Sequence, residues 1–320
     1  GGCTQTPRRL TSGAAAGGAL DAFPPAMPRS GILLLDKPRG LTSNQALGRA
    51  KYLLGLRKAG HTGALDPMAT GLLPLCFGEA TKVSAFLLDA DKGYLAEARL
   101  GVATDSGDAD GAEIARQPVP DLDRARVEQA LEEFRGPIEQ VPPMYSALKH
   151  NGKRLHELAR AGIEVDRPPR RVTIFNLDLL ALEGDRLTLR VQCSKGTYIR
   201  SLAMDLGERL GCGAHLTALR RERSGPFELR DAVTLDDLEA LGSETERRAL
   251  LQAPETALGA LPEVRVDADG ERAIRHGQSV AVDRDPADPV RIRHGDVFVG
   301  LGRIDPDGRL RPRRVFNPED

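Results

Sequence analysis

The stretch Gly60–Pro74, which reads GHTGALDPMATGLLP, places an acid and an imidazole a few residues apart. Asp66 can act as a nucleophile or take a proton, and His61 can act as an acid or a base. The glycines permit positive φ and the prolines fix φ, so we expect a stiff loop here, not a helix or a central strand. Because Asp66 precedes Pro67, its backbone is biased toward an extended conformation. The sequence therefore predicts a carboxylate that is held in a fixed place.

The same residues also suit an ordinary turn. Asp-Pro pairs commonly open turns in which the carboxylate accepts only a local backbone hydrogen bond. Glycine and proline punctuate many loops that carry no chemistry. Residue types alone leave both interpretations of Asp66 and His61 open.

The segment His61–Pro67 (HTGALDP) resembles the signature loop of the TruB family of tRNA pseudouridine synthases, and we call it the signature loop. The match is ungapped and highly specific. The resemblance implies that Asp66 is the catalytic residue. It also implies that His61 fills the space that a flipped-out base leaves in the RNA.

Further stretches resemble the same family, in the family's order. They are Gly31–Pro38 with Lys37, the triplet Lys92-Gly93-Tyr94, Lys195–Arg200 (KGTYIR), and Leu219-Arg220 with the trailing Gly225–Phe227. The resemblance covers about residues 31–320. One departure is Gly93, where the family usually has a larger residue.

The resemblance implies catalytic roles for Tyr94 and Arg200 beside Asp66. Tyr94 would stack on the flipped base, and Arg200 would keep the Asp66 carboxylate ionised and oriented through charge-assisted hydrogen bonds. Without the resemblance, Arg200 reads as an exposed arginine at a helix start and Tyr94 as a half-buried sheet residue.

The resemblance implies substrate or RNA contacts for a second set of residues. Tyr198 would pack against the floor of the site and Leu219 would give the base an apolar wall. Lys37 and Lys82 would contact phosphates. Taken one at a time, these residues also suit a sheet tyrosine, a core leucine and two solvated lysines.

The reaction that the resemblance implies is the isomerisation of the T-loop uridine at tRNA position 55 to pseudouridine, with base flipping. It breaks a C–N glycosidic bond and forms a C–C bond to the same sugar carbon. That chemistry demands no redox group, metal or small-molecule cofactor. The implied partner is the T-arm stem-loop of tRNA, and the protein is expected to act as a monomer.

Two other classes of function remain open. An RNA-binding or RNA-folding module would show the same basic stretches but would place no demand on Asp66 and Arg200 together. A carboxylate glycosidase would normally need a second catalytic acid, and none accompanies Asp66 in its loop. Nucleotide-binding loops of the G-x-x-x-x-G-K-[ST] or G-x-G-x-x-G kind are absent from the sequence.

Charge is unevenly distributed along the chain, although the formal net charge is only −1. Residues 146–171 hold seven Lys/Arg against three Asp/Glu, and residues 195–223 hold six against three. Residues 231–263 reverse this with two against eight. Basic stretches with a compensating acidic one allow a phosphate-binding face in a protein of near-zero net charge.

Composition places the chain among globular proteins, with 40% hydrophobic and 28% charged residues. The four cysteines are scattered without paired spacing, so we expect reduced thiols and no zinc site. The acidic run Thr104–Gly111 lacks the glutamate that closes a calcium loop, which favours a solvated loop. No apolar run reaches the roughly 18 residues that span a membrane. We expect a cytoplasmic protein that does not associate with membranes.

Hydrophobic periodicity predicts an α+β fold: a mixed, largely antiparallel sheet with surrounding helices, followed by a small all-β module. Residues 1–30 are predicted to be a disordered leader, 31–258 the catalytic domain and 259–320 a PUA-like RNA-binding domain. Within the catalytic domain we expect strands at about 31–37, 93–101, 171–182, 187–194 and after His215. We expect helices at about 43–54, 81–88, 127–134, 199–210 and 234–251, and a basic helix on which Leu155 and Leu158 face inward.

Overall fold

The computed structural model describes residues 28–146, 148–150 and 152–317, so the predicted leader lies outside the described residues except for its last three positions. The helices are α1 (Ser43–Leu54), η1 (Gly78–Val83), α2 (Ser84–Leu88), α3 (Arg124–Glu132), α4 (Leu155–Arg160), α5 (Ile199–Arg209), η2 (Leu229–Asp231), α6 (Leu235–Ala240), α7 (Glu244–Arg248), η3 (Pro254–Leu258) and α8 (Ala268–Arg275). No described helix is long and apolar enough to cross a membrane.

A large mixed sheet organises the first part of the chain. Its strands run in the order β1 (Gly31–Lys37), β3 (Thr70–Phe77), β12 (Ala214–Ser224), β4 (Lys92–Leu100), β11 (Arg186–Cys193), β10 (Arg170–Glu183) and β7 (Gly136–Gln140). The short strands β2 (Ala59–His61) and β13 (Phe227–Glu228) add to β3 and β12. The β12–β3 pair is parallel and the other described pairs of this sheet are antiparallel. The predicted fold class is confirmed.

Strand β12 is longer than the short strand that the sequence predicted after His215, with 11 residues. It lies between β3 and β4, so Arg221 is opposite Gly71 on one side and Tyr94 on the other. Strand β3 begins at Thr70, shortly after the signature loop, so the expectation of no central strand over Gly60–Pro74 was wrong for its last five residues. Gly71 lies within this strand, where it permits the close approach of the β12 backbone. Strand β12 therefore joins the loop to the strand that carries Tyr94.

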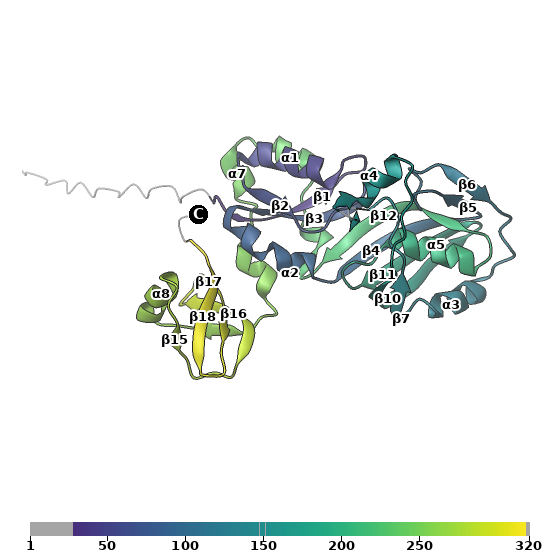
Figure 1. Ribbon diagram of the computed structural model, residues 1–320. Coiled ribbons are helices and arrows are strands. Elements are labelled where there is room, and N and C mark those ends of the chain that lie inside the picture. Colours follow the sequence, from purple (N-terminus) through teal and green to yellow (C-terminus); the bar gives the residue numbers. More distant parts are fainter. Residues whose placement is uncertain (1–27, 147, 151, 318–320) are drawn as a thin grey trace, which may run out of the picture.

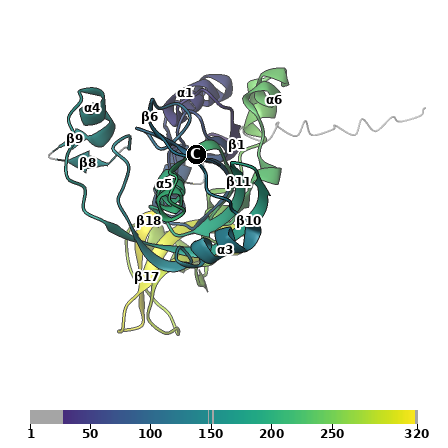
Figure 2. The same ribbon diagram turned by 90° about the vertical axis from the view of Figure 1, so that its right-hand side faces the viewer.

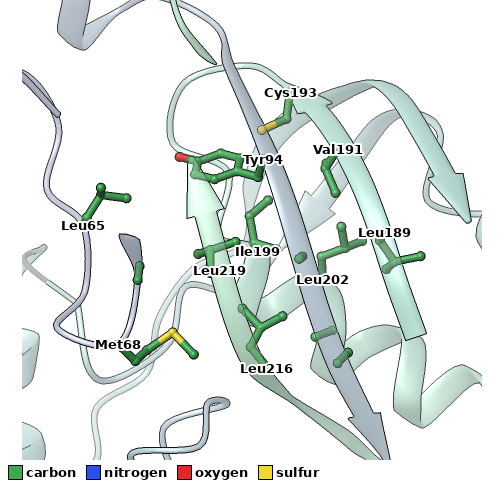
Figure 3. Close-up of a cluster of buried hydrophobic side chains, with 14 of the residues drawn as sticks. Leu65, Met68, Tyr94, Leu189, Val191, Cys193, Ile199, Leu202, Leu216 and Leu219 are labelled. Carbon is green, nitrogen blue, oxygen red and sulfur yellow. The ribbon is translucent and has the colours of Figure 1, made fainter. Parts of the chain in front are cut away.

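One face of this sheet packs against helices around a continuous apolar core (Figure 1). Residues from β4, β11 and β12 meet Ile199 and Leu202 of α5 in that core, as Figure 3 shows. In the same view the hydroxyl end of Tyr94 points away from Cys193 and Val191. The apolar core thus fixes the ring of Tyr94 and leaves its polar end free for other contacts.

Local signals explain where several helices begin and end. Helix α1 has the predicted capping box, in which Thr42 and Gln45 bond each other's backbone, and it ends at Gly55 in the left-handed conformation. The helix predicted over 81–88 is instead a 3-10 helix followed by the short α2. The helix predicted over 234–251 is two short helices, because Ser243 caps a new start with Glu246.

The segment after β7 leaves the sheet and returns to it at β10. It contains β8 (Lys149–His150), β9 (Lys153–Arg154) and α4, which stand away from the sheet in Figure 2. We call residues 141–169 the arm. Following strand β4 in the chain, β5 (Val102–Thr104) and β6 (Glu113–Arg116) form a small separate hairpin that holds the acidic loop.

The last part of the chain forms a five-stranded sheet in the order β14 (Glu263–Arg265), β16 (Ala287–His294), β17 (Val297–Ile304), β18 (Arg309–Val315) and β15 (Val280–Ala281). Helix α8 accompanies it and was not predicted from the sequence. Leu301 and Phe316 of this module share a buried cluster with Ile32 and Leu34 of β1. The module is bonded to η1, where Lys82 donates to the Val315 carbonyl at 2.8 Å and Glu79 accepts the Asn317 N–H at 3.2 Å. Figure 1 shows the module beside the catalytic part.

Candidate active site

A cavity of about 310 Å³ opens where the signature loop, β4, β12 and the start of α5 meet. Asp66 supplies the only carboxylate among the described residues that line it. The lining combines apolar, aromatic, hydroxyl and cationic side chains: Leu65, Leu88, Leu219, Tyr94, Tyr198, Ser146, Ser194, Thr197, Lys92, Lys195, Arg200 and Arg221. Such a mixture suits a planar, polar ligand with an apolar face.

Asp66 and Arg200 form an ion pair at this cavity, with 2.9 Å between Asp66 Oδ2 and Arg200 Nε. The arginine side chain is 4% exposed, whereas 38% of the Asp66 side chain remains exposed. Arg200 Nη1 donates to the Ser106 carbonyl at 3.0 Å and Nη2 donates to the Tyr145 carbonyl at 2.7 Å. Arg200 is thus a fixed, buried cation and Asp66 is its accessible partner, which differs from an ordinary surface arginine.

Asp108 is a second carboxylate beside Arg200, and the sequence analysis did not single it out. Its Oδ2 lies 3.8 Å from Arg200 Nε. Its Oδ1 accepts from the Ser106 hydroxyl at 2.6 Å and from the Asp110 backbone N–H at 3.1 Å. The acidic loop is therefore a built support for the arginine, not the solvated loop that we expected.

The groups around Asp66 shift the pKa of its carboxyl in opposite directions. Burial raises the pKa of the Asp66 carboxyl, Arg200 lowers it, and Asp108 raises it. The pKa is raised on balance. The carboxyl therefore binds its proton more tightly than an ordinary aspartate, which suits a group that takes up a proton or bonds to carbon.

Tyr94, Leu219 and Tyr198 all lie in the cavity wall, as the sequence-based site requires. Tyr94 and Leu219 are each 8% exposed and lie on the neighbouring strands β4 and β12. Burial raises the pKa of both tyrosines, so their phenols are neutral at physiological pH. A flat ring between Tyr94 and Leu219 would have an aromatic contact and an aliphatic contact.

His61 lies on the signature loop but outside the cavity lining. It ends β2, opposite Leu75 of β3, and is half-buried. Burial lowers the pKa of its imidazole, and the nearby Arg221 lowers it further. A neutral ring at the edge of the site, outside the cavity, is compatible with a part in RNA binding and not with direct chemistry.

Lys37 does not suit the phosphate contact that we expected of it. The side chain is 0% exposed, and its ammonium group donates to the carbonyls of Pro38 and Leu41 at 2.8 and 2.6 Å. Burial lowers its pKa to about 8, against the opposing effect of Asp66. Lys37 holds the turn after β1 and adds positive charge behind Asp66.

Lys82 also has partners within the protein in place of an RNA phosphate. Its ammonium group bonds the Glu79 carboxylate and donates to the Val315 carbonyl at 2.8 Å. It lies 5.3 Å from the centre of the Phe316 ring. Lys82 therefore ties the end of β18 to η1.

A carboxamide fixes the start of α5, which carries Arg200. Gln140, 2% exposed, donates through Nε2 to the Tyr198 carbonyl at 3.2 Å and accepts the Tyr198 N–H at 3.0 Å. One turn further, the Ser201 hydroxyl donates to the Val141 carbonyl at 2.8 Å. The base of the arm is thus bonded to the helix turn that holds the catalytic candidate.

A fully buried arginine, Arg221, joins several parts of the site and was also missed from the sequence. Its Nε donates to the Leu72 carbonyl at 2.7 Å and its Nη2 to the Gly63 carbonyl at 3.0 Å. The run RRER around it suggests a solvent-exposed strand end, so no local signal marked it as buried. Within the described residues, no group of three or more His, Cys, Asp or Glu side chains could hold a metal ion.

Comparisons with known proteins match nearly the whole chain. Residues 51–199 match the family model of the TruB family pseudouridylate synthase N-terminal domain. Residues 200–259 match the tRNA pseudouridylate synthase B C-terminal domain, and residues 262–316 match the pseudouridine synthase II TruB C-terminal model.

Curated relatives and solved structures agree with these matches. The tRNA pseudouridine synthase B of Aromatoleum aromaticum is 57% identical over 287 residues, which are 90% of this chain and 92% of that protein. The protein of the same name from Nitrosococcus oceani is 53% identical over 89% of this chain and 94% of its own length. A crystal structure of a Cbf5-Nop10-Gar1 complex contains a chain that superposes with a TM-score of 0.70 at 31% identity, covering 91% of this chain and 86% of that one.

Proposed function

The chain belongs to the TruB family of pseudouridine synthases and is a tRNA pseudouridine synthase, and from this premise we propose that it modifies the T-loop uridine at tRNA position 55 with Asp66 as the catalytic residue. The observation that carries the proposal is the 2.9 Å pair between Arg200 and the accessible Asp66 at the cavity. A binding module without chemistry gives no reason to place a buried arginine against one open carboxylate.

Each wall of the cavity has a proposed part in the reaction. The target uridine leaves its stack and enters the cavity, where its base lies against Tyr94 and Leu219. Arg200 keeps Asp66 in place and ionised for the covalent or proton-transfer step. His61, at the rim, takes the space that the base has left in the RNA. Tyr198 packs beneath the start of α5.

The remaining parts of the molecule serve RNA binding in this proposal. Residues 31–258 form the catalytic domain, and residues 259–320 contribute affinity through phosphate contacts and no chemistry. The protein acts as a monomer on the T-arm stem-loop, in the cytoplasm where its tRNA substrate is found.

Pseudouridine mapping on an isolated T-arm stem-loop, incubated with the purified protein, tests the proposal. The expected result is one pseudouridine at the T-loop position that corresponds to position 55, and none in a stem-loop in which cytidine replaces that uridine. Tight binding of the stem-loop without any pseudouridine would show instead that the T-arm is not the substrate.

A further inference from the structure

Arg221 is a buried cation whose charge no carboxylate offsets at contact distance. Its side chain is 1% exposed, and among the described residues no acid lies within ion-pair distance of it. A guanidinium removed from water costs several kcal/mol unless it is paired or fully hydrogen-bonded. Arg221 instead donates to the neutral carbonyls of Leu72 and Gly63. Its positive charge therefore acts on whatever occupies the neighbouring cavity.

Three contacts connect Arg221 to the parts that make the site. The Gly63 carbonyl belongs to the signature loop, and the Leu72 carbonyl belongs to β3, so one guanidinium fixes the loop to the sheet. Arg221 is opposite Tyr94 in the register of β12 and β4 and lines the same cavity. Burial raises the pKa of the Tyr94 hydroxyl, and the neighbouring Arg221 guanidinium lowers it.

The backbone of Arg221 lies so close to β3 that no side chain fits between them at Gly71. A Cβ at Gly71 would lie 2.4 Å from the Arg221 carbonyl oxygen, so only glycine permits this approach of the two strands. A Cβ at Gly63 would lie 3.7 Å from Nη1, in ordinary contact. The Arg221 backbone is thus held close to β3, and its guanidinium lies against the signature loop at Gly63.

Positive charge exceeds negative charge around the cavity. Arg200, Arg221, Lys92 and Lys195 line it, and Lys37 lies behind Asp66, which makes five cationic side chains. Lys195 is paired with Asp89 at 2.8 Å. Two carboxylates, Asp66 and Asp108, face them. A pocket with surplus fixed positive charge stabilises negative charge that develops inside it.

We infer that Arg221 is a positioning residue for the isomerisation: it fixes the signature loop to β3, holds the Tyr94 hydroxyl, and places a permanent positive charge beside the base. The inference rests on the roles proposed above for Asp66 and Tyr94. It deepens them, because it assigns to Tyr94 a hydroxyl that is oriented by a specific cation.

The chemistry gives this charge a use. When the C1′–N1 bond of the target uridine breaks, its electron pair goes to the base and is spread over the ring nitrogens and oxygens. The base then forms the C5–C1′ bond, the C5 proton leaves, and a proton is taken up at N1. Atoms and electrons balance without an oxidant or co-reactant. A fixed cation beside the detached base lowers the energy of its negative charge.

Fluorine NMR of protein labelled with 3-fluorotyrosine tests the link to Tyr94 without any RNA. The chain has four tyrosines and no tryptophan, and a Tyr94→Phe variant assigns the resonance of interest. Fluorine makes the phenol more acidic and so brings its titration into a milder pH range. In Arg221→Met the Tyr94 resonance should shift and should titrate at higher pH than in the unsubstituted protein. Arg221→Lys should give an intermediate shift.

The matched control is Arg248→Met. Arg248 is also buried, at 8% exposed, and donates to the Leu54 and Gly55 carbonyls at the end of α1, outside the cavity lining. This variant loses carbonyl contacts of the same kind, together with an ion pair to Glu244 at 2.9 Å, and its Tyr94 resonance should stay in place. Its single-turnover rate should be unchanged.

Single-turnover rates and RNA dissociation constants then distinguish a positioning role of Arg221 from a role in stability or RNA binding. Arg221→Met should lower the single-turnover rate about 100-fold, with the dissociation constant for T-arm RNA changed less than about threefold, and Arg221→Lys should recover part of the rate. In the Tyr94→Phe background, Arg221→Met should cost clearly less than it does in the unsubstituted protein, because the part of its effect that passes through the hydroxyl is already lost.

Two results overturn the inference. One is an unmoved Tyr94 resonance in whichever Arg221 variant folds, and the other is fully additive rate losses in the double variant. If Arg221→Met does not fold, Arg221→Lys decides by the same readouts. Because the fluorine measurement needs no substrate, it tests the role of Arg221 even if the T-arm proves to be the wrong RNA.

Discussion

At the scale of single residues, the site depends on one accessible carboxylate and the buried arginine that holds it. Asp66→Asn keeps the size of the side chain and removes its charge and its reactive oxygen. Product formation should fall by about four orders of magnitude, equivalent to roughly 5.5 kcal/mol of transition-state stabilisation. Single-turnover formation of pseudouridine measures this loss, and filter binding checks that RNA affinity survives.

The partner residue supplies the control for that measurement. Arg200→Ala should be severe on its own, and adding it to Asp66→Asn should cost far less than the sum of the two, because each acts through the other. An Asp66→Asn variant with near-normal turnover would take the catalytic role away from this residue.

The position of Asp108 beside Arg200 leads to a prediction about how the reaction rate depends on pH. It raises the pKa of Asp66, as burial also does, while Arg200 lowers it. If the reacting form is the carboxylate, the rate falls as pH drops through the pKa of Asp66. Asp108→Asn removes a negative neighbour, so the pKa of Asp66 should decrease and the acid limb of the rate profile should move to lower pH.

The control for the pH measurement is Asp110→Asn, since Asp110 is half exposed and pairs only distantly with Arg39 at 3.9 Å. Its acid limb should coincide with that of the unsubstituted protein. A limb in Asp108→Asn that moved to higher pH would mean that Asp108 acts on Asp66 mainly by holding Arg200.

At the scale of elements, the carboxamide of Gln140 connects the base of the arm to α5. Gln140→Leu removes both hydrogen bonds to Tyr198 and should lower the single-turnover rate by roughly 10- to 100-fold, since small displacements of a catalytic group are costly. Gln140→Glu keeps the acceptor and should be milder. Gln117→Leu, at an exposed side chain, is the control. A change in KM with none in rate would place Gln140 in RNA binding instead.

Substitution of two glycines by alanine should change the stability of the protein in opposite directions. Gly71 has φ +102° and a Cβ there would meet the Arg221 backbone, so Gly71→Ala should lower the free energy of unfolding by roughly 3 kcal/mol. Gly48 lies inside α1 with nothing near a Cβ, so Gly48→Ala should raise it by about 0.5–1 kcal/mol. Urea denaturation measures both, and a tolerated Gly71→Ala would mean that β3 and β12 can separate.

The sequence predicted those features that depend on local signals. The capping box of α1 and the hairpin of β10 and β11 follow from neighbouring residues, and the structure contains them. The predicted loop around Asp66 is present only as far as Ala69, because Thr70–Pro74 belong to β3. Resemblance to a family added Tyr94, Arg200, Tyr198 and Leu219, and the cavity brings these together.

What the sequence could not predict depends on contacts between distant segments. Arg221 lies in a run of charged residues and is buried only because β12 pairs with β3 and β4. Lys37 and Lys82 read as exposed lysines, yet one is covered by the turn after β1 and the other by the last strand. Asp108 gains its role only when the acidic loop meets α5.

At the scale of the whole molecule, the last module has two parts to play. It is a proposed RNA-binding domain, and its Leu301 and Phe316 belong to a buried apolar cluster that also contains Ile32 and Leu34 of β1. Its arginines are largely paired with acids, as in Arg311 with Asp305 and Arg313 with Asp288, so RNA phosphates must compete with these partners. Glu255 before the module holds Arg291 and Arg293 at 3.0 and 2.8 Å. These pairs fix the direction in which the module leaves the catalytic part.

Truncation after Leu258 should therefore have two effects. It should weaken binding of T-arm RNA and reduce its salt dependence, because phosphate contacts are lost. It should also lower the melting temperature, since Leu301 and Phe316 are lost from the buried cluster to which Ile32 and Leu34 belong. Turnover at saturating RNA should persist in the fraction that circular dichroism shows to be folded.

Phe316→Ala in the intact chain separates the two effects. It should lower the free energy of unfolding by about 3 kcal/mol and leave RNA affinity nearly unchanged. A folded truncated protein with no turnover at any RNA concentration would show that the module takes part in the chemistry after all.

The shared cluster between β1 and the last module has a consequence for the order in which the protein is made. Ile32 and Leu34 leave the ribosome early, and Leu301 and Phe316 come almost a whole chain length later. The buried cluster that includes the first strand therefore lacks its last members throughout synthesis, although the segments that carry Asp66, Tyr94 and Arg200 are already complete. Translation has to reach the last residues of the chain before this cluster is completely closed to water.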